Sequence, residues 1–513
     1  MNRVLVLGGG PNGLAAAAVL ARAGREVLVL EQAPSIGGLG GGREFHSGFK
    51  VPGLLHDDEG VPSVLVRELG LEAHGLSTRC RPRDVLAIAG GGPGLLLSAD
   101  SNAIGTELDA QAKGDAAAWR EWQALRSRIR PLMRRFLDGP PPPPSLSQGG
   151  GIWGLLGTGL AIRRLGRRTL QELARMGPSC VADCLRERFS GDLVQAALAA
   201  PALYGSWCGP WSPGTGAAFL LREAAAGPGI VGGTAALVGA LEAACRVAGV
   251  EVRTNAAVGS LEVSGDMVAG AVLEDGEVLE GEVLATCDPR WLGGLLPQGV
   301  LPPAAARELR AVRGRGTTAK LHLAVDGLPE VAGRDDLPEV IRIGGHLDEL
   351  EQAFDPVKYR SLPEKPMLEV RVPSLENPSL APEGAHVVSV LVHHVPWDLD
   401  GGWNDAARTQ FQKATFDRLE ENLPGLNSRV RAAETLVPPD LDAAFGLVEG
   451  HIHHGEMALD QILSFRPTPS LSGFATPVEG LWLGGSGSHP GGGMPGAAGR
   501  LAAKKLLQSR PVE

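Results

Sequence analysis

Short apolar runs alternate with glycine-rich turns at the start of the chain. The run 3–7 is apolar after its first residue and predicts a buried strand, and an alanine-rich segment at 14–23 predicts a helix that Gly24 ends. A second apolar run at 26–30 predicts another strand and is followed by Glu31. The order strand, helix, strand predicts the first unit of a parallel α/β sheet.

The turn between the first strand and the helix, Gly8–Gly13, has the spacing G-x-G-x-x-G in the context that dinucleotide binding requires. Gly8 allows the tight turn, Gly10 lets the backbone approach a pyrophosphate, and Gly13 lets the helix pack closely on the strand. Glu31 lies where an acidic residue accepts the ribose hydroxyls, and its charge disfavours a 2′-phosphate. This segment therefore predicts a site for the adenosine half of a dinucleotide.

The same glycine spacing recurs at Gly149–Gly154 without that context. No apolar run precedes this copy, and no strand that ends in an acidic residue follows it. It comes after Pro140–Pro144, a run that favours an extended, semi-rigid segment. We expect no nucleotide at this second copy.

The other end of the chain carries a second glycine-rich segment. A short apolar run at 480–483 leads into seven glycines between Gly484 and Gly496, and then into a predicted helix. Glycines leave backbone amide groups uncovered, which suits a turn that lies flat against a large planar ligand. We therefore predict that this turn faces a flavin ring.

The middle of the chain predicts a further part of the nucleotide-binding domain. Gly232 and Gly233 open a helix that extends to about 248, and segments 250–263 and 267–283 alternate as strands of a small antiparallel meander. Strands at 318–325 and 386–394 would belong to a substrate lobe. The predicted fold class is α/β, with a Rossmann-like FAD-binding domain assembled from discontinuous segments (1–75, 225–297 and 469–513) and an α+β substrate or cap domain (76–224 and 298–468).

Composition limits the class of protein. With 513 residues the chain can form two or three domains. A net charge of -10 disfavours a nucleic acid partner, because phosphate binding needs clustered positive charge. The six cysteines form no C-x-x-C pair and no zinc spacing, and no signal peptide or roughly 20-residue apolar span is evident. We therefore expect a cytoplasmic protein.

One segment indicates lipid contact or a pocket cap. Residues 151–162 carry no charge and include Trp153, and residues 163–168 add four arginines. An uncharged segment with an adjoining basic face resembles an interfacial helix, which predicts peripheral membrane contact through 151–168. A helix that caps a substrate pocket would show the same pattern, so both interpretations stay open.

Three separated motifs resemble the flavin amine oxidase and phytoene desaturase superfamily. They are the fingerprint through Gly38, the helix after Gly232 with its meander, and the C-terminal glycine turn. The segment 455–461, the pair Arg466-Pro467 and the turn 486–493 are most similar to a phytoene desaturase-like branch named for a pyridine nucleotide-disulfide oxidoreductase domain. The likeness covers nearly the whole chain and implies a FAD-dependent oxidoreductase.

The resemblance also implies which residues contact FAD. The glycines of the fingerprint would hold the pyrophosphate, Glu31 the ribose, and the backbone of Val258 the adenine. The helix N-terminus near Met494 would stabilise negative charge on the reduced flavin. After Gly38 this chain departs from the family's pattern, and Arg43 could contact a phosphate there. The full set of expected contacts is Gly8, Gly10, Pro11, Asn12, Gly13, Glu31, Gly38, Arg43, Val258, Gly485, Ser486, Met494, Pro495 and Ala497.

The name of that branch suggests disulfide chemistry, which this sequence does not favour. Paired redox cysteines would have to follow the first nucleotide unit, and no cysteine precedes Cys80. A second fingerprint for NADPH is missing too. We expect a single flavin and no stable nicotinamide site.

The resemblance implies that a hydride leaves a C–H bond for flavin N5 while the neighbouring carbon loses a proton. The substrate would be apolar, isoprenoid or polyene-like, and the electron acceptor would be oxygen or a quinone. Candidate polar groups near the ring are His489, His454, Glu456 and Asp460. Each has a structural alternative: His489 could cap its turn, and the carboxylates could be solvated or pair with Arg466.

Two further groups of side chains have alternative interpretations. His451, His453 and His454 could present imidazoles to a metal, but the third ligand of a catalytic site is not evident, so we expect no metal. Tyr204 and Trp207, with Trp211, could form the walls of a pocket or pack in the core.

Three other functions fit the same motifs. A redox-neutral isomerase would use reduced flavin, and an amine oxidase would produce hydrogen peroxide from amines. A flavin-stabilised interaction protein without turnover would explain the small number of candidate catalytic side chains.

Overall fold

The computed structural model describes residues 3–142, 152–334 and 337–509. The second glycine copy, Gly149–Gly154, begins outside these residues.

Five strands of the described chain form a parallel sheet in the order β17, β11, β1, β2, β7. The two apolar runs predicted as strands are confirmed as β1 and β2, and both are almost completely buried, as expected for a sheet covered on both faces. The strand bounds are β1 Arg3–Leu7, β2 Glu26–Leu30, β7 Glu251–Arg253, β11 Glu282–Ala285 and β17 Leu481–Leu483.

Three helices pack together on one face of this sheet. The helix after the fingerprint begins at Pro11, whose fixed φ suits the first helical position, and not at residue 14 as predicted. Apolar side chains of these helices and of β1 and β2 form one buried core. The helices are α1 (Pro11–Arg22), α9 (Gly233–Val247) and α16 (Ala497–Ser509).

The antiparallel meander is smaller than predicted. It contains β8 (Val258–Ser264), β9 (Met267–Leu273) and β10 (Val278–Glu280), whereas β7 and β11 join the parallel sheet. All four residues of β11 are buried, so the strand has no alternation of apolar and polar residues. Its position between β1 and β17 shows that it is a central strand. The meander covers the second face of the parallel sheet.

A larger mixed sheet forms the other lobe of the described chain, in the order β16, β12, β15, β14, β13, β5, β6. The predicted strands 318–325 and 386–394 are confirmed as β12 and β15, which pair antiparallel along their whole length. The bounds are β5 Val85–Ile88, β6 Leu95–Leu97, β12 Thr318–Asp326, β13 Val340–Ile343, β14 Met367–Arg371, β15 Ala385–His393 and β16 Val430–Leu436. A separate pair joins β3 (Arg43–His46) to β4 (Phe49–Val51).

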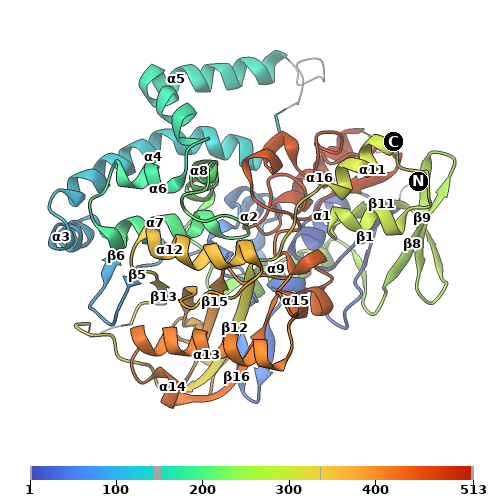
Figure 1. Cartoon of the computed structure of the whole chain (residues 1–513). Helices are drawn as coiled ribbons and strands as arrows, with labels where there is room; N and C mark the ends of the chain where they lie inside the picture. The colour runs from blue at the N-terminus through green and yellow to red at the C-terminus, as the bar shows by residue number, and fades with distance from the viewer. Residues whose placement is uncertain (1–2, 143–151, 335–336, 510–513) are drawn as a thin grey trace.

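Helices cover both faces of the mixed sheet. A helical group packs on the end that contains β5 and β6, and α13 packs on the opposite face (Figure 1). The helices of the group are α3 (Ser101–Gln111), α4 (Asp115–Asp138), α6 (Val181–Arg186), α7 (Asp192–Leu203), α8 (Thr215–Ala225) and α12 (Leu347–Phe354). Apart from α5, the other α-helices of the described chain are α2 (Ser63–Leu69), α10 (Leu292–Leu295), α11 (Pro303–Arg310), α13 (Asp405–Asn422), α14 (Leu426–Arg429) and α15 (Pro438–Phe445).

Helix α5 (Ile152–Met176) projects from the body of the molecule (Figure 1). Its backbone leaves helical geometry at Gly166, where φ is 77° and ψ is 159°, so the element is two helices joined at a kink. Across the described ranges, no helix is both long enough and apolar enough to cross a bilayer.

Candidate functional site

The glycines of the N-terminal turn are of two kinds. Two of them are required by close packing, and one faces open space. Gly8 has a φ of +102°, and a Cβ on it would lie 2.7 Å from Thr286 Oγ1. A Cβ on Gly13 would overlap the carbonyl oxygen of Gly8. At Gly10 no atom lies within 4 Å of the place that a Cβ would occupy. The open side of Gly10, at the N-terminus of α1, fits the approach of a pyrophosphate.

Glu31 is fixed at the carboxyl end of β2. Its Oε2 accepts a hydrogen bond from the Gly9 amide at 2.7 Å, and its Oε1 accepts one from the Ala33 amide at 2.9 Å. Each carboxylate oxygen keeps a lone pair for a ribose hydroxyl. The Ala256 amide binds the Glu31 carbonyl at 2.9 Å, which brings the start of β8 at Val258 close to the same place. The geometry therefore suits a nucleoside between Glu31 and β8.

The two ends of the chain meet at Asn12. Its side-chain amide donates to Ser486 Oγ at 3.2 Å, and its Oδ1 accepts from the Gly499 amide at 3.4 Å. A cavity, which we call the cradle, opens between these two segments. It is lined by Pro11, Asn12, Leu39, Gly40, Leu55, Asp57, Thr234, Ile452, His453, Ser486, Gly493, Met494 and Pro495.

The cradle brings together expected FAD contacts from both ends, namely Pro11, Asn12, Ser486, Met494 and Pro495. Gly38 lies opposite Gly10, because a Cβ on Gly38 would be 3.5 Å from the Gly10 Cα. Gly485 is packed against the backbone of Thr286 and Cys287 after β11, and Ala497 is the first residue of α16. These placements fit a dinucleotide that extends from Glu31 past Gly10 to the C-terminal turn.

Arg43 is the expected contact that the structure places elsewhere. Its guanidinium forms a two-bond ion pair with Glu434 of β16, with Nη1 at 2.8 Å from Oε1. The Glu434 carboxylate neutralises the charge of Arg43 locally, which disfavours Arg43 as a phosphate ligand.

Arg466 organises the C-terminal side of the cradle. The side chain is 2% exposed and donates to the carbonyl oxygens of Ser486 and His453 at 2.8 and 2.7 Å. Further bonds reach the carbonyls of Gly455, Glu456 and Gln461. Burial lowers the pKa of Arg466 to about 10, so the guanidinium remains charged at neutral pH.

The carboxylate candidates face away from this arginine. We predicted that Glu456 and Asp460 could pair with Arg466, but Glu456 binds Arg313 and Arg315, and Asp460 binds Arg313 at 2.7 Å. The segment is not a regular helix either, since residues 459–461 form only a short 3-10 turn. The guanidinium of Arg466 donates its hydrogen bonds to carbonyl oxygens, and the two carboxylates bind other arginines instead.

The two histidine candidates lie outside the residues that line the cradle. Nε2 of His489 donates to the carbonyl oxygen of Phe136 at 2.8 Å, and burial lowers the pKa of its imidazole to about 4. This bond ties the glycine turn to the end of α4, which favours the structural interpretation. His454 has a left-handed backbone with φ of +55°, and burial lowers the pKa of its imidazole although Asp288 lies nearby.

His453, which the sequence suggested only as a metal ligand, lines the cradle itself. It is 1% exposed, and neither ring nitrogen has a hydrogen-bond partner among the residues described. Nδ1 of His451 accepts hydrogen bonds from the backbone amides of His453 and Gly455, both at 3.2 Å. Within the same described ranges, no group of three or more metal-ligating side chains is found.

A buried polar cluster lies next to the cradle and was not predicted. Lys320 in β12 and Glu369 in β14 are each 1% exposed, and His56 lies between them. The Lys320 ammonium nitrogen is 2.7 Å from Nε2 of His56, and Nδ1 of His56 is 3.1 Å from Glu369 Oε1. Glu369 also binds Arg342 at 3.1 Å and the hydroxyl of Tyr204. A charged residue inside an otherwise apolar strand is the signal that could have revealed this cluster.

Burial controls the charge states in the polar cluster. Desolvation and then Lys320 lower the pKa of His56 well below its usual range, and desolvation and then Arg371 do the same to Lys320. Burial alone would raise the pKa of Glu369, but His56 and Arg371 hold it well below its usual range. A neutral imidazole therefore lies between an amine that loses its proton readily and a carboxylate that stays ionised.

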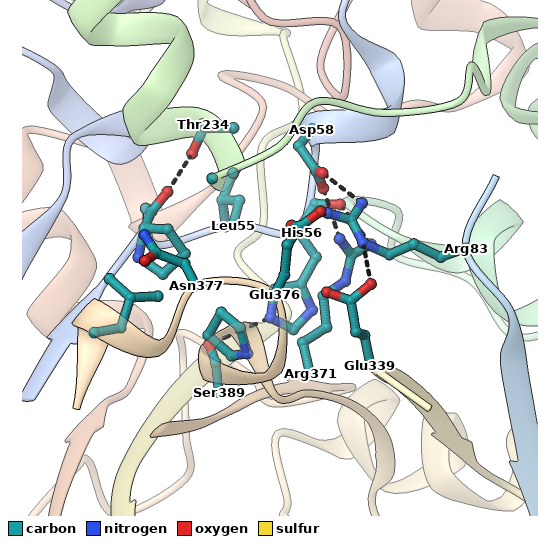
Figure 2. A pocket seen from close by; sticks show the side chains of 16 residues that line it. Leu55, His56, Asp58, Arg83, Thr234, Glu339, Arg371, Glu376, Asn377 and Ser389 are labelled. Carbon is teal, nitrogen blue, oxygen red and sulfur yellow. Dashed lines mark hydrogen bonds and ion pairs between the residues drawn. The ribbon is translucent and has the colours of Figure 1, made fainter. Parts of the chain in front are cut away.

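The segment 55–58 separates the cradle from a second cavity. Asp57 lines the cradle, whereas His56 and Asp58 line the second cavity, and Leu55 lines both. Figure 2 shows the ion pairs of this cavity: Asp58 binds Arg83 at 2.5 Å and Arg371 at 2.6 Å. Arg83 also binds Glu339 at 3.2 Å.

The aromatic residues proposed as pocket walls have different roles. Tyr204 stacks on His393 with ring centroids 4.1 Å apart, and its hydroxyl binds Glu369 of the polar cluster. Trp207 lies under the guanidinium of Arg315 at 3.8 Å, and Trp211 lies under that of Arg186.

Known proteins are similar to this chain in sequence and in fold. The model of the flavin containing amine oxidoreductase family matches residues 12–507. A mouse protein, pyridine nucleotide-disulfide oxidoreductase domain-containing protein 2, is 31% identical over 539 residues, which cover 98% of this chain and 93% of that protein. A phytoene desaturase (lycopene-forming) of a Paracoccus species is 27% identical over 285 residues, or 53% of each chain. An oxidoreductase from Methanosarcina mazei has the same fold, with a TM-score of 0.62, 16% identity, and coverage of 99% of this chain and 100% of that one.

These findings confirm three expectations drawn from the sequence: the resemblance, the α/β fold and the FAD cofactor. The family match begins at Asn12, near the end of the N-terminal glycine turn, and includes the whole C-terminal turn. The structure brings the two turns to one cavity. The chain therefore belongs to the flavin-containing amine oxidoreductase family, whose cofactor is FAD.

Proposed function

We propose that the chain is a FAD-dependent dehydrogenase of the desaturase type, which removes a hydride and a proton from adjacent atoms of a largely apolar substrate, isoprenoid or polyene-like. The observation that carries this proposal is the buried cradle, where a neutral imidazole, His453, lies among the expected FAD contacts. Bound FAD would supply the hydride acceptor. The side chains of the cradle would orient the cofactor and exclude water, and the substrate proton would pass to a base or to solvent.

An apolar hollow next to the glycine turn supports an apolar substrate. It has a volume of about 370 Å³ and is lined by Met457, Ala218, Pro213 and others between α8 and residues 457–465. Met457 separates the hollow from the turn, because its sulfur is 2.8 Å from the place of a Cβ on Gly491. Leu459 and Phe465 at its rim are 44% and 49% exposed. A hydrocarbon body could therefore lie here, close to the turn that faces the flavin.

We also propose a peripheral membrane contact of a cytoplasmic protein through α5. The sequence of residues 152–162 contains no charge, and Arg163, Arg164, Arg167 and Arg168 are exposed beyond them. Exposed arginines beside an apolar segment suit an anionic lipid surface. Sedimentation with vesicles of anionic lipid, compared with neutral vesicles, tests this contact; replacing the four arginines with glutamine should abolish it.

A second candidate function is the oxidation of a polar substrate such as an amine. The second cavity favours it, because Asp58, Arg83 and Arg371 line its wall, and charged groups at the wall of a cavity suit a ligand that forms hydrogen bonds. An amine oxidase would form hydrogen peroxide with amines, whereas a desaturase would respond to lipid extracts.

An anaerobic screen of the FAD-loaded protein tests the proposal. Lipid extracts should bleach the flavin, and amines should not. Reoxidation of the bleached protein by air or by a quinone then identifies the electron acceptor. Bleaching by amines, with peroxide released once air is admitted, would favour the second function. Isomerised lipid formed by the reduced protein without net oxidation of the flavin would favour an isomerase, and a complete lack of turnover would favour an interaction protein.

A further inference from the structure

His453 is a buried polar group without a partner. Its side chain is 1% exposed, and throughout the described residues neither Nδ1 nor Nε2 has a hydrogen-bond partner. Burying a polar group that forms no hydrogen bond destabilises the folded protein. Because the ring lines the cradle together with Asn12, Ser486 and Met494, a ligand in the cradle is the group that could satisfy it.

The position of this ring is fixed by its surroundings. The carbonyl oxygen of His453 accepts a bond from Arg466 at 2.7 Å, and its amide donates to Nδ1 of His451 at 3.2 Å. Gly205 and Gly492 leave room for the ring, because a Cβ on either glycine would overlap it. The imidazole is therefore held in place before any ligand binds.

The same two glycines show which ring atoms of His453 face the protein. A Cβ on Gly205 would come closest to Nδ1, and a Cβ on Gly492 would come closest to Cδ2 and Cγ. Nε2, at the tip of the ring, is not among the nearest atoms to either glycine. Nε2 is thus the atom that the ring presents beyond its two flanking glycines.

The imidazole is neutral in this position. Desolvation and then Arg222 lower the pKa of His453 well below its usual range, with further lowering by His451, Arg466 and His454. A neutral imidazole has one N–H donor and one acceptor nitrogen. It can donate a hydrogen bond to a ring nitrogen or carbonyl without adding a positive charge.

We propose that Nε2 of His453 donates a hydrogen bond to the isoalloxazine ring of FAD and stabilises its reduced form. This role rests on the FAD site and not on the proposed substrate. A donor aimed at a group that gains negative charge on reduction binds the reduced form more tightly, which raises the reduction potential.

Three variants test this role. His453→Phe keeps a ring between Gly205 and Gly492 but removes both nitrogens, and His453→Gln restores a side-chain N–H donor. The matched control is His394→Phe, since His394 is also 1% exposed with two ring nitrogens that lack partners in the described chain. His394 packs against Phe354 and does not line the cradle.

The readout is the flavin midpoint potential, measured by anaerobic dithionite titration of FAD-loaded protein against a reference dye, which needs no substrate. His453→Phe should weaken the preference for reduced over oxidised FAD about tenfold, a shift of about 30 mV to more negative potential for a two-electron couple. His453→Gln should recover part of this shift, and His394→Phe should match the wild type.

An unchanged potential in His453→Phe, or an equal shift in His394→Phe, would overturn the role of His453. If the phenylalanine variant does not retain FAD, His453→Leu gives the same readout. A wild-type protein that takes up no FAD would overturn the cofactor site and this inference together, whereas a failed substrate screen would affect only the proposed function.

Discussion

Arg466 binds the carbonyl oxygen of Ser486 with two nitrogens, Nε at 3.0 Å and Nη2 at 2.8 Å. The same guanidinium holds the carbonyl of His453. One buried side chain therefore fixes the C-terminal glycine turn against the segment that carries His453, and so determines the shape of one wall of the cradle.

Replacing Arg466 by methionine should destabilise the protein by about 3–5 kcal/mol and release FAD, because several buried carbonyl oxygens lose their charged donor. Urea unfolding and the FAD content of purified protein measure both effects. The matched control is Arg246→Met, which removes an exposed pair with Glu242 on α9 and should change neither quantity. An Arg466→Met protein with wild-type stability and FAD content would contradict the anchoring role.

Gly10→Leu should fold normally and bind FAD at least roughly 100-fold more weakly, a loss of about 2.7 kcal/mol. The backbone of Gly10 has a φ of -73°, which leucine adopts, and its side chain would enter the open space beside the fingerprint. Titration of the apoprotein with FAD measures the affinity. Gly239→Leu places the same side chain in open space on the exposed side of α9 and should leave FAD binding unchanged. Equal affinities in the two variants would show that Gly10 does not face the cofactor.

His489→Ala should lower the free energy of unfolding by about 1–3 kcal/mol and leave FAD bound, because it leaves the Phe136 carbonyl without its donor. His489→Gln, which retains an N–H donor, should recover part of the loss. The checks are urea unfolding and FAD content. Loss of FAD with unchanged stability would instead show that His489 faces the ligand.

Stability should fall as the pH is lowered from 6.5 to about 4. Burial lowers the pKa of His451 and His393 to about 3 and that of His394 and His489 to about 4, from an ordinary value of 6.5. In this window the unfolded chain takes up protons that the folded chain does not, so the unfolded state is favoured. Each histidine contributes up to about 1.4 kcal/mol per pH unit.

Urea unfolding across that pH window measures the slope. His394→Phe removes one buried histidine and should make the slope shallower. A slope that is unaffected by the loss of His394 would show that its imidazole is protonated in the folded protein.

The local pattern of the chain predicted the parts of the fold that depend on short-range rules. The strands β1 and β2, the helix after Gly233, and the strands β12 and β15 follow from apolar runs bounded by glycine. The meander was overestimated because β11, a short buried strand, shows no alternation, and only its pairing with β1 reveals that it is central.

The polar part of the site depends on contacts between distant residues, which no local pattern reports. Lys320 and His56 are 264 positions apart, and His56 and Glu369 are 313 apart. The sequence likewise could not show that Arg466 binds carbonyl oxygens, because such bonds depend on where the backbone turns and not on residue type. The sequence suggested His453 only as a metal ligand, because its place in the cradle depends on contacts between distant residues.

The most direct test of the proposed chemistry is single-turnover reduction of the FAD-loaded protein. The protein is mixed without oxygen with successive fractions of a lipid extract, and the organic product is analysed by mass spectrometry. We expect stoichiometric flavin bleaching and a product lighter than its substrate by one hydride and one proton. A flavin that stays oxidised with every lipid fraction, or bleaching without a dehydrogenated product, would contradict the proposed dehydrogenase.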